Sequence, residues 1–284
     1  MDIHAFIENH FHSAPERVTA LGGGCIADVR RIDLRDGRSL VVKIATSGYE
    51  TLDIEGNMLG YLATHSSLPV PKVFVSQPDA LAMEWIDGEA GGLGQKAQSH
   101  AAELIAGLHS QTADQFGFDR DTLIGPLRQP NPWTESWIEF FREQRLLLMA
   151  RIAYDAGRFG ADDVRRFERF AARLDEWLTE PPQPALLHGD LWGGNILMSG
   201  DRVVGFIDPA IYYGHPEMDL AFSTLFGTFG DSFFSRYQEI APLDDGFFET
   251  RRDIYNLYPL LVHTRLFGGG YRDQALRILS RLGF

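Results

Sequence analysis

The sequence of 284 residues contains a single cysteine, Cys25, and no long hydrophobic run. One cysteine excludes an intrachain disulfide framework and a cysteine-rich zinc site. A monomer and a dimer linked through Cys25 both stay open. No apolar run approaches the ~20 residues that a membrane span requires, and the N-terminal Met1-Asp2-Ile3-His4 lacks the basic and apolar regions of a secretory leader. We therefore expect a cytoplasmic protein that does not act at a membrane.

Positive charge is also scarce, since 26 Lys and Arg residues face 39 Asp and Glu residues and the formal net charge is −13. Such a surface repels phosphate backbones, so we expect no nucleic acid partner. Any phosphate that the protein binds needs a local site. The 44% of hydrophobic residues and the length are those of a globular protein with a sizeable core.

The chain changes character near residue 87. Before it, short β-rich runs alternate with turn signals, and residues 49–64 form a helical pattern in which Leu52, Leu59 and Leu62 share a face with Glu55. The β runs are residues 29–34, 40–44, 72–75 and 80–86. After a glycine-rich stretch, helical patterns cover residues 101–109, 133–152, 162–178, 220–226 and 247–265. The sequence predicts an α+β fold with two lobes: a small antiparallel β-rich lobe at 1–87 and a larger, mainly helical lobe at 88–284.

Two acids and an amide mark the edges of short apolar strands in the second lobe. Asp190 and Asn195 follow the apolar run 185–187, and Asp208 ends the run 203–207. Mg²⁺ prefers oxygen ligands, typically one or two side chains besides phosphates and water, and Asn195 and Asp208 offer them. Phosphoryl transfer also needs a carboxylate that accepts the proton of the acceptor hydroxyl, a role that suits Asp190. Each piece alone also fits a structural turn, but together they predict a phosphotransferase site.

A glycine-rich run and a lysine in the first lobe support this interpretation. The run Gly22-Gly23-Gly24-Cys25 lets backbone amides approach a nucleotide's phosphates, although by itself it also fits a plain hairpin. Lys43 ends a β run just downstream, and Glu55 lies on the apolar face of the next helix. This order predicts an ion pair in which Lys43 contacts the α- and β-phosphates and Glu55 holds it.

These residues resemble the protein-kinase-like superfamily, in its branch of aminoglycoside phosphotransferase-like kinases, and within that branch the fructosamine/ketosamine-3-kinase family. The resemblance extends over nearly the whole chain. It rests on three segments: Gly22-Gly23-Gly24-Cys25-Ile26, residues 187–195 (LHGDLWGGN) and residues 207–217 (IDPAIYYGHPE). The residues Leu-Trp-x-Gly at 191–194 are what narrows it to the family.

The resemblance implies a protein-kinase-like fold with ATP and Mg²⁺ as cofactors, Asp190 as catalytic base, Asn195 and Asp208 as Mg²⁺ ligands, and Lys43 paired with Glu55 on the phosphates. It implies that the segment Met83-Glu84-Trp85-Ile86 binds adenine through its backbone, and that Asp219 braces the catalytic loop through backbone amides. Asp28 and Ala27 depart from the family's pattern in the phosphate loop.

The implied reaction is phosphorylation of the 3-hydroxyl of a ketosamine, either a small molecule or a glycated protein, in deglycation. The aromatic residues Trp192, Tyr212 and Tyr213 can flank a sugar-amine cation, although packing in the core explains each equally well. His215 and His263 are weaker candidates for the acceptor pocket. Two other functions stay open: a kinase of the same superfamily for an aminoglycoside or choline, and a nucleotide-binding pseudokinase that acts as a regulator.

Overall fold

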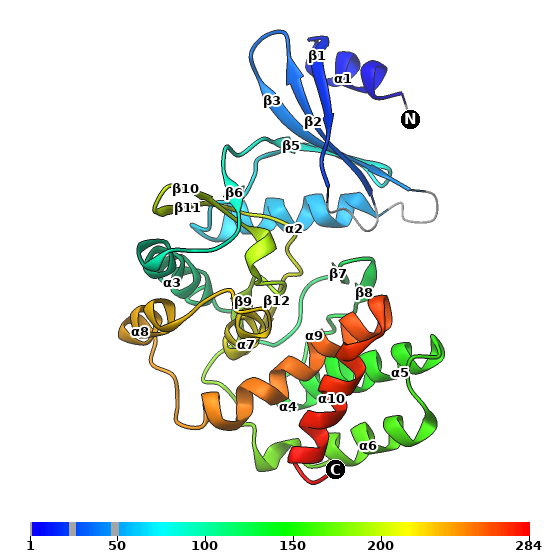
Figure 1. Ribbon diagram of the computed structural model, residues 1–284, viewed down its shortest axis with the longest axis vertical. Helices are drawn as coiled ribbons and strands as arrows, with labels where there is room; N and C mark the ends of the chain where they lie inside the picture. Colours follow the sequence, from blue (N-terminus) through cyan, green and yellow to red (C-terminus); the bar gives the residue numbers. More distant parts are fainter. Residues whose placement is uncertain (1, 23–26, 47–50) are drawn as a thin grey trace.

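The computed structural model describes residues 2–22, 27–46 and 51–284. Within them an antiparallel five-stranded sheet precedes a largely helical region (Figure 1), which confirms the predicted α+β fold. The sheet has the strand order β1-β2-β3-β5-β4. Its strands are β1 (Pro15–Ala20), β2 (Ala27–Leu34), β3 (Ser39–Ala45), β4 (Val73–Ser76) and β5 (Ala80–Glu84).

The two faces of the sheet pack against different helices because side chains alternate along each strand. Ala80 and Ala82 join the cluster of α1 (Ile3–Phe11), whereas Leu81 and Met83 pack with α2 (Leu52–His65). On β3 the same alternation puts Val42 with α1 and Val41 with α2. Lys43 shares the parity of Val41, so it points toward α2. Neither α1 nor β1 was predicted from the sequence.

The helical region contains more helices than the sequence patterns indicated. The helix expected at 133–152 begins only at Trp137, because Ser136 accepts a hydrogen bond from Glu139 N (3.1 Å) and Glu180 accepts one from Trp137 N (2.6 Å). The helices α8 and α10 were not predicted. The α-helices are α3 (Gln95–His109), α4 (Trp137–Phe140), α5 (Leu148–Asp155), α6 (Ala161–Ala171), α7 (Glu217–Leu225), α8 (Asp231–Ile240), α9 (Arg252–Phe267) and α10 (Gly270–Arg281). Shorter turns of π- or 3₁₀-helix are η1 (Phe141–Leu147), η2 (Leu174–Glu176), η3 (Gly193–Asn195) and η4 (Phe247–Arg251).

Short strands hold the loops that carry the predicted catalytic residues. In one pair β9 (Ala185–Leu187) lies antiparallel to β12 (Tyr212–Gly214), and in another β10 (Ile196–Ser199) lies antiparallel to β11 (Arg202–Phe206). The strand β6 (Glu89–Ala90) joins β10, and β7 (Thr122–Ile124) pairs with β8 (Leu127–Gln129). The lobe boundary at 87/88 stays a prediction. In the described part of the chain, no helix has the length and apolar character of a membrane span.

Candidate active site

Lys43 lies between two carboxylates, one close to it in the sequence and one far from it. Its Nζ donates to Glu55 Oε1 at 2.7 Å and also to Asp208 Oδ1. Lys43 and Glu55 are both buried, while the side chain of Asp208 is 46% exposed. The predicted Lys43–Glu55 contact is therefore present. The contact with Asp208 was not predicted, and it places the lysine of β3 beside the predicted metal ligand.

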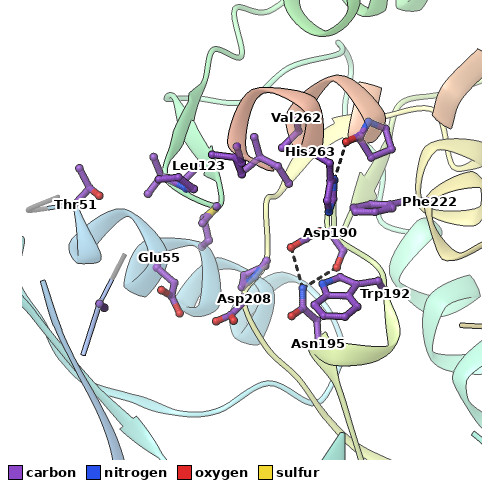
Figure 2. A pocket seen from close by; sticks show the side chains of 18 of the residues that line it. Thr51, Glu55, Leu123, Asp190, Trp192, Asn195, Asp208, Phe222, Val262 and His263 are labelled. Carbon is purple, nitrogen blue, oxygen red and sulfur yellow. Dashed lines mark hydrogen bonds between the residues drawn. The ribbon is translucent and has the colours of Figure 1, made fainter. Parts of the chain in front are cut away.

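Asp190 and Asn195 hold one another within the loop between β9 and β10 (Figure 2). Asn195 Nδ2 donates to Asp190 Oδ2 and to the backbone oxygen of Asp190, both at 2.9 Å. These two bonds use the amide nitrogen, which leaves the amide oxygen of Asn195 for another partner. The loop thus brings a carboxylate and an amide oxygen into the same cavity as Asp208.

Asp219 on α7 braces the loop that carries Asp190. Its two carboxylate oxygens accept the backbone N–H groups of His188 and Gly189, each at 2.8 Å. This geometry confirms the bracing predicted for Asp219. His109 on α3 lies 3.2 Å from Asp219 and 2.8 Å from the hydroxyl of Tyr237 on α8, so a buried chain of polar groups reaches the loop from two further helices. Neither His109 nor Tyr237 was identified from the sequence.

Two glycines of the loop have no room for a side chain. Gly189 has φ +81°, and a Cβ there would lie 2.0 Å from the carbonyl oxygen of Ala210. The close approach is held by a hydrogen bond from Ala210 N to His188 O at 2.7 Å. At Gly194 a Cβ would lie 2.2 Å from the ring of Trp192. The spacing Trp-x-Gly therefore has a physical reason, because the indole lies over the second glycine of the pair that follows it.

The oxygen atoms that remain at the site fit a magnesium ion. Asp208 adopts a left-handed backbone conformation (φ +51°), which is strained for a residue with a side chain, and its carboxylate lines the cavity. Asn195 lines the same cavity. One carboxylate and one amide oxygen are a suitable partial set for Mg²⁺, which keeps waters and phosphate oxygens as its other ligands.

The cavity includes only some of the residues predicted for nucleotide and acceptor. Lys43, Glu55, Asp190, Asn195, Asp208 and Trp192 line it. Met83, Glu84, Trp85 and Ile86 lie at the end of β5 and after it, outside this wall, and the amides of Glu84 and Trp85 already donate to Lys72 O and Ser39 O. Gly22 is exposed, and Gly23, Gly24 and Cys25 lie outside the described residues.

The three predicted acceptor aromatics have different surroundings. Trp192 is 39% exposed in the cavity wall, whereas Tyr212 and Tyr213 are buried. Tyr212 packs under the guanidinium of Arg145, and the hydroxyl of Tyr213 is 2.9 Å from that of Tyr61. Much of the remaining wall comes from the β7–β8 turn and one face of α9, and of these residues the sequence had suggested only His263 for the acceptor pocket. Those residues are Leu123, Ile124, Gly125, Pro126, Tyr258, Pro259, Val262, His263, Leu266 and Phe267.

The pKa values of Asp190 and Asp208 are shifted in opposite directions. Burial raises the pKa of Asp190 to about 7, although the hydrogen bond from Asn195 acts against the rise. Partial loss of hydration acts to raise the pKa of Asp208, but the charge of Lys43 and the hydrogen bonds with Lys43 and Glu55 together outweigh it, so the pKa is lowered. Asp208 is therefore anionic and suited to a cation, while Asp190 can take up a proton near neutral pH. Two carboxyls that differ in this way suit different roles in one site.

The raised pKa of Asp190 has a measurable effect on the stability of the fold. We expect the nucleotide-free protein to lose stability, relative to its Asp190→Asn variant, as the pH rises from about 4 to about 7. The unfolded chain releases the Asp190 proton near the ordinary pKa of 3.8, whereas the folded protein keeps it until about 7. Between these values the unfolded state binds fewer protons, so raising the pH favours unfolding. Thermal melts of both proteins across this range test the expectation, and a constant difference between them would contradict it.

Solved structures with the same arrangement of elements include phosphotransferases. The aminoglycoside phosphotransferase APH(4)-Ia in complex with ADP and hygromycin B superimposes with a TM-score of 0.67 at 15% identity, over 100% of both chains. A likeness at this identity establishes the fold, which is that of the aminoglycoside phosphotransferase-like and protein-kinase-like enzymes. Within this superfamily that structure shows that ADP is bound.

The family follows from closer relatives. The family model described as fructosamine kinase matches residues 1–283, and the chain belongs to this family of kinases. It is 35% identical to the protein-ribulosamine 3-kinase, chloroplastic, of Arabidopsis thaliana, over 93% of this chain and 82% of that protein. It is 33% identical to the ketosamine-3-kinase of Mus musculus, over 92% of this chain and 93% of that protein. The crystal structure of a fructosamine-3-kinase candidate from Thermobifida fusca superimposes with a TM-score of 0.88 at 34% identity, over 98% of this chain and 97% of that one.

Proposed function

We propose that the protein transfers the γ-phosphoryl group of ATP to the 3-hydroxyl of a ketosamine, the adduct of a sugar with an amine. The observation that carries the proposal is the placement of Asp190 in a cavity between the Lys43–Glu55–Asp208 cluster and an apolar, aromatic wall. The relatives named ketosamine-3-kinase and ribulosamine 3-kinase support the acceptor.

In this proposal each polar residue has a separate task. Lys43 neutralises charge on the phosphates, and Glu55 keeps its ammonium group in place. Asn195 and Asp208 hold Mg²⁺, which when bound screens the charge of the transferred phosphoryl group. Asp190 orients the 3-hydroxyl and accepts its proton. The product carries phosphate, a better leaving group than hydroxide, on the carbon next to the carbonyl, so its decomposition releases the amine and reverses glycation.

The cavity wall disfavours a polycationic acceptor. The acids that line the cavity among the described residues are Glu55, Asp190 and Asp208, all of which already have tasks at the phosphate end. A drug with several ammonium groups needs further carboxylates beside them, because each buried charge requires a partner. An aminoglycoside is therefore a poorer fit than a ketosamine with one amine. A pseudokinase is also a poorer fit, because the cavity contains a complete set of polar groups.

A screen of ATP consumption tests the acceptor. Ribulosamine, erythrulosamine, fructosamine, an aminoglycoside and choline are each supplied with Mg²⁺ and ATP, and the Asp190→Asn variant serves as the control for contaminating kinases. We expect turnover with one or more of the three ketosamines, and a phosphate on O3 by NMR of the product. Turnover only with the aminoglycoside or choline would overturn the ketosamine assignment, and ATP consumption that persists in the variant would overturn the mechanism.

A further inference from the structure

The mouth of the cavity carries a row of aromatic rings that phosphoryl transfer does not require. Three of the eight large hydrophobic side chains that are exposed among the described residues lie here: Trp192 (39%), Phe226 (41%) and Phe267 (55%). They come from the catalytic loop, the end of α7 and the end of α9. Exposed apolar groups that gather at one place, and do not scatter singly, mark a binding surface.

The rings form a continuous row in space, in which His263 connects Phe226 to Phe267. The centroid of Phe226 lies 5.9 Å from that of Trp192 and 5.2 Å from that of His263. The ring of His263 lies 5.6 Å from that of Phe267. Trp192, His263 and Phe267 line the cavity, so the row, defined here as Trp192, Phe226, His263 and Phe267, continues the wall beside Asp190 out to the surface.

The position of the row relative to Asp190 decides which part of an acceptor reaches it. Figure 2 shows Thr51 and Glu55 on one side of the cavity and Trp192, Phe222 and His263 on the other, beside Asp190. The phosphates belong to the side of Glu55, where Lys43 lies. The acceptor must then approach Asp190 from the side of the row.

The chemistry of the row selects one of the two arms of a ketosamine. Two arms extend from C3, the carbon whose hydroxyl is phosphorylated. One arm carries the remaining hydroxyl groups, and the other carries the carbonyl, the amine and the substituent of the amine. Hydroxyl groups need hydrogen-bond partners, whereas ring faces favour apolar groups and cations. His263 Nδ1 donates to Pro259 O at 2.7 Å, and burial lowers the pKa of His263, so its ring is neutral and does not repel an ammonium group.

We propose that this row binds the amine-bearing arm of the acceptor, and that Phe226 and Phe267 make the enzyme favour ketosamines whose amine has an apolar substituent. The proposal rests on the proposed function and adds a class of substrate to it. The side chain of a glycated lysine and a free alkyl- or arylamine both present such a substituent, a chain of methylene groups or a ring next to the nitrogen.

The test compares two ketosamines with the same sugar, one made from methylamine and one from benzylamine. Because burying the phenyl ring removes apolar surface from water, we expect kcat/KM of the wild type to be roughly tenfold higher for the benzylamine adduct. Phe226→Ala and Phe267→Ala should each reduce this ratio to about threefold or less, and Phe226→Leu and Phe267→Leu should keep part of it. A third acceptor, the same sugar on a lysine of a glycated carrier protein, shows whether the loss extends to protein-bound amines.

Phe74→Ala is the matched control, since Phe74 is also 41% exposed but lies on β4, outside the cavity wall. In this variant the ratio of kcat/KM for the benzylamine adduct to kcat/KM for the methylamine adduct should equal that of the wild type. A wild-type ratio near one, or a ratio that survives in both alanine variants, would overturn the role of the row while turnover of the methylamine adduct still upholds the proposed function. If neither adduct is phosphorylated, the proposed function and this inference fail together.

Discussion

Replacing Asp190 by asparagine is expected to lower kcat by about 10²- to 10⁴-fold and to leave the affinity for ATP within a few-fold of the wild type. The side chains have nearly the same shape, and the oxygen of an asparagine can still accept the hydrogen bond that Asn195 donates at 2.9 Å. What the amide cannot do is take up the proton of the acceptor hydroxyl. Steady-state kinetics with a ketosamine, together with direct nucleotide binding, separates these effects.

Asp201→Asn is the matched control for this substitution. Asp201 lies in the turn between β10 and β11 and pairs with Lys96 on the surface at 3.0 Å. The same change of chemistry there should leave kcat unaltered, because the residue is outside the cavity. A kcat within about threefold of the wild type in Asp190→Asn would remove Asp190 from its role as general base.

Replacing Asp219 by alanine is expected to lower the free energy of unfolding by about 3–5 kcal/mol. The side chain is 1% exposed and accepts two backbone N–H groups at 2.8 Å. Its removal leaves those donors and His109 without their acceptor in a buried place, and unpaired buried groups are costly. Urea unfolding at a fixed pH measures the loss.

Asp219→Asn adds a graded test of the same brace. It keeps one oxygen for Gly189 or His188 but turns an NH₂ group toward the other amide, so its stability should lie between those of the wild type and Asp219→Ala. Asp201→Ala, which breaks an exposed ion pair, should cost less than about 1 kcal/mol. Equal unfolding free energies for Asp219→Ala and Asp201→Ala would show that the hydrogen bonds to the loop contribute little.

The parts of the site that the sequence predicted are those set by local periodicity. The alternation of side chains along β3 turns Lys43 toward α2. The helical spacing of the apolar residues on α2 turns Glu55 toward the sheet, where it meets Lys43. Both patterns are visible within a short window, so their meeting could be predicted. Asp190, Asn195 and Asp208 were predicted from another local signal, their positions at the edges of short apolar runs.

The remaining contacts depend on how distant segments pack, which no local pattern encodes. Nothing near Asp219 in the sequence points to His109 or Tyr237, which reach it from other helices. Likewise Tyr212 is close to Asp208 along the chain yet buried beneath Arg145, while Phe267, far along the chain, lines the cavity. The missed helices α8 and α10 did carry a signal. Phe233, Phe234 and Tyr237 and then Ala275, Ile278 and Leu279 recur at helical spacing.

The contact of Lys43 with two carboxylates bears on how tightly the protein can hold a nucleotide. Fixing a lysine side chain in one conformation costs up to about 2 kcal/mol of conformational entropy. Glu55 and Asp208 already fix it in the protein without nucleotide, so that loss belongs to folding. An incoming phosphate therefore meets an ammonium group that is already immobilised, and the affinity for the nucleotide is not reduced by the ordering of this side chain.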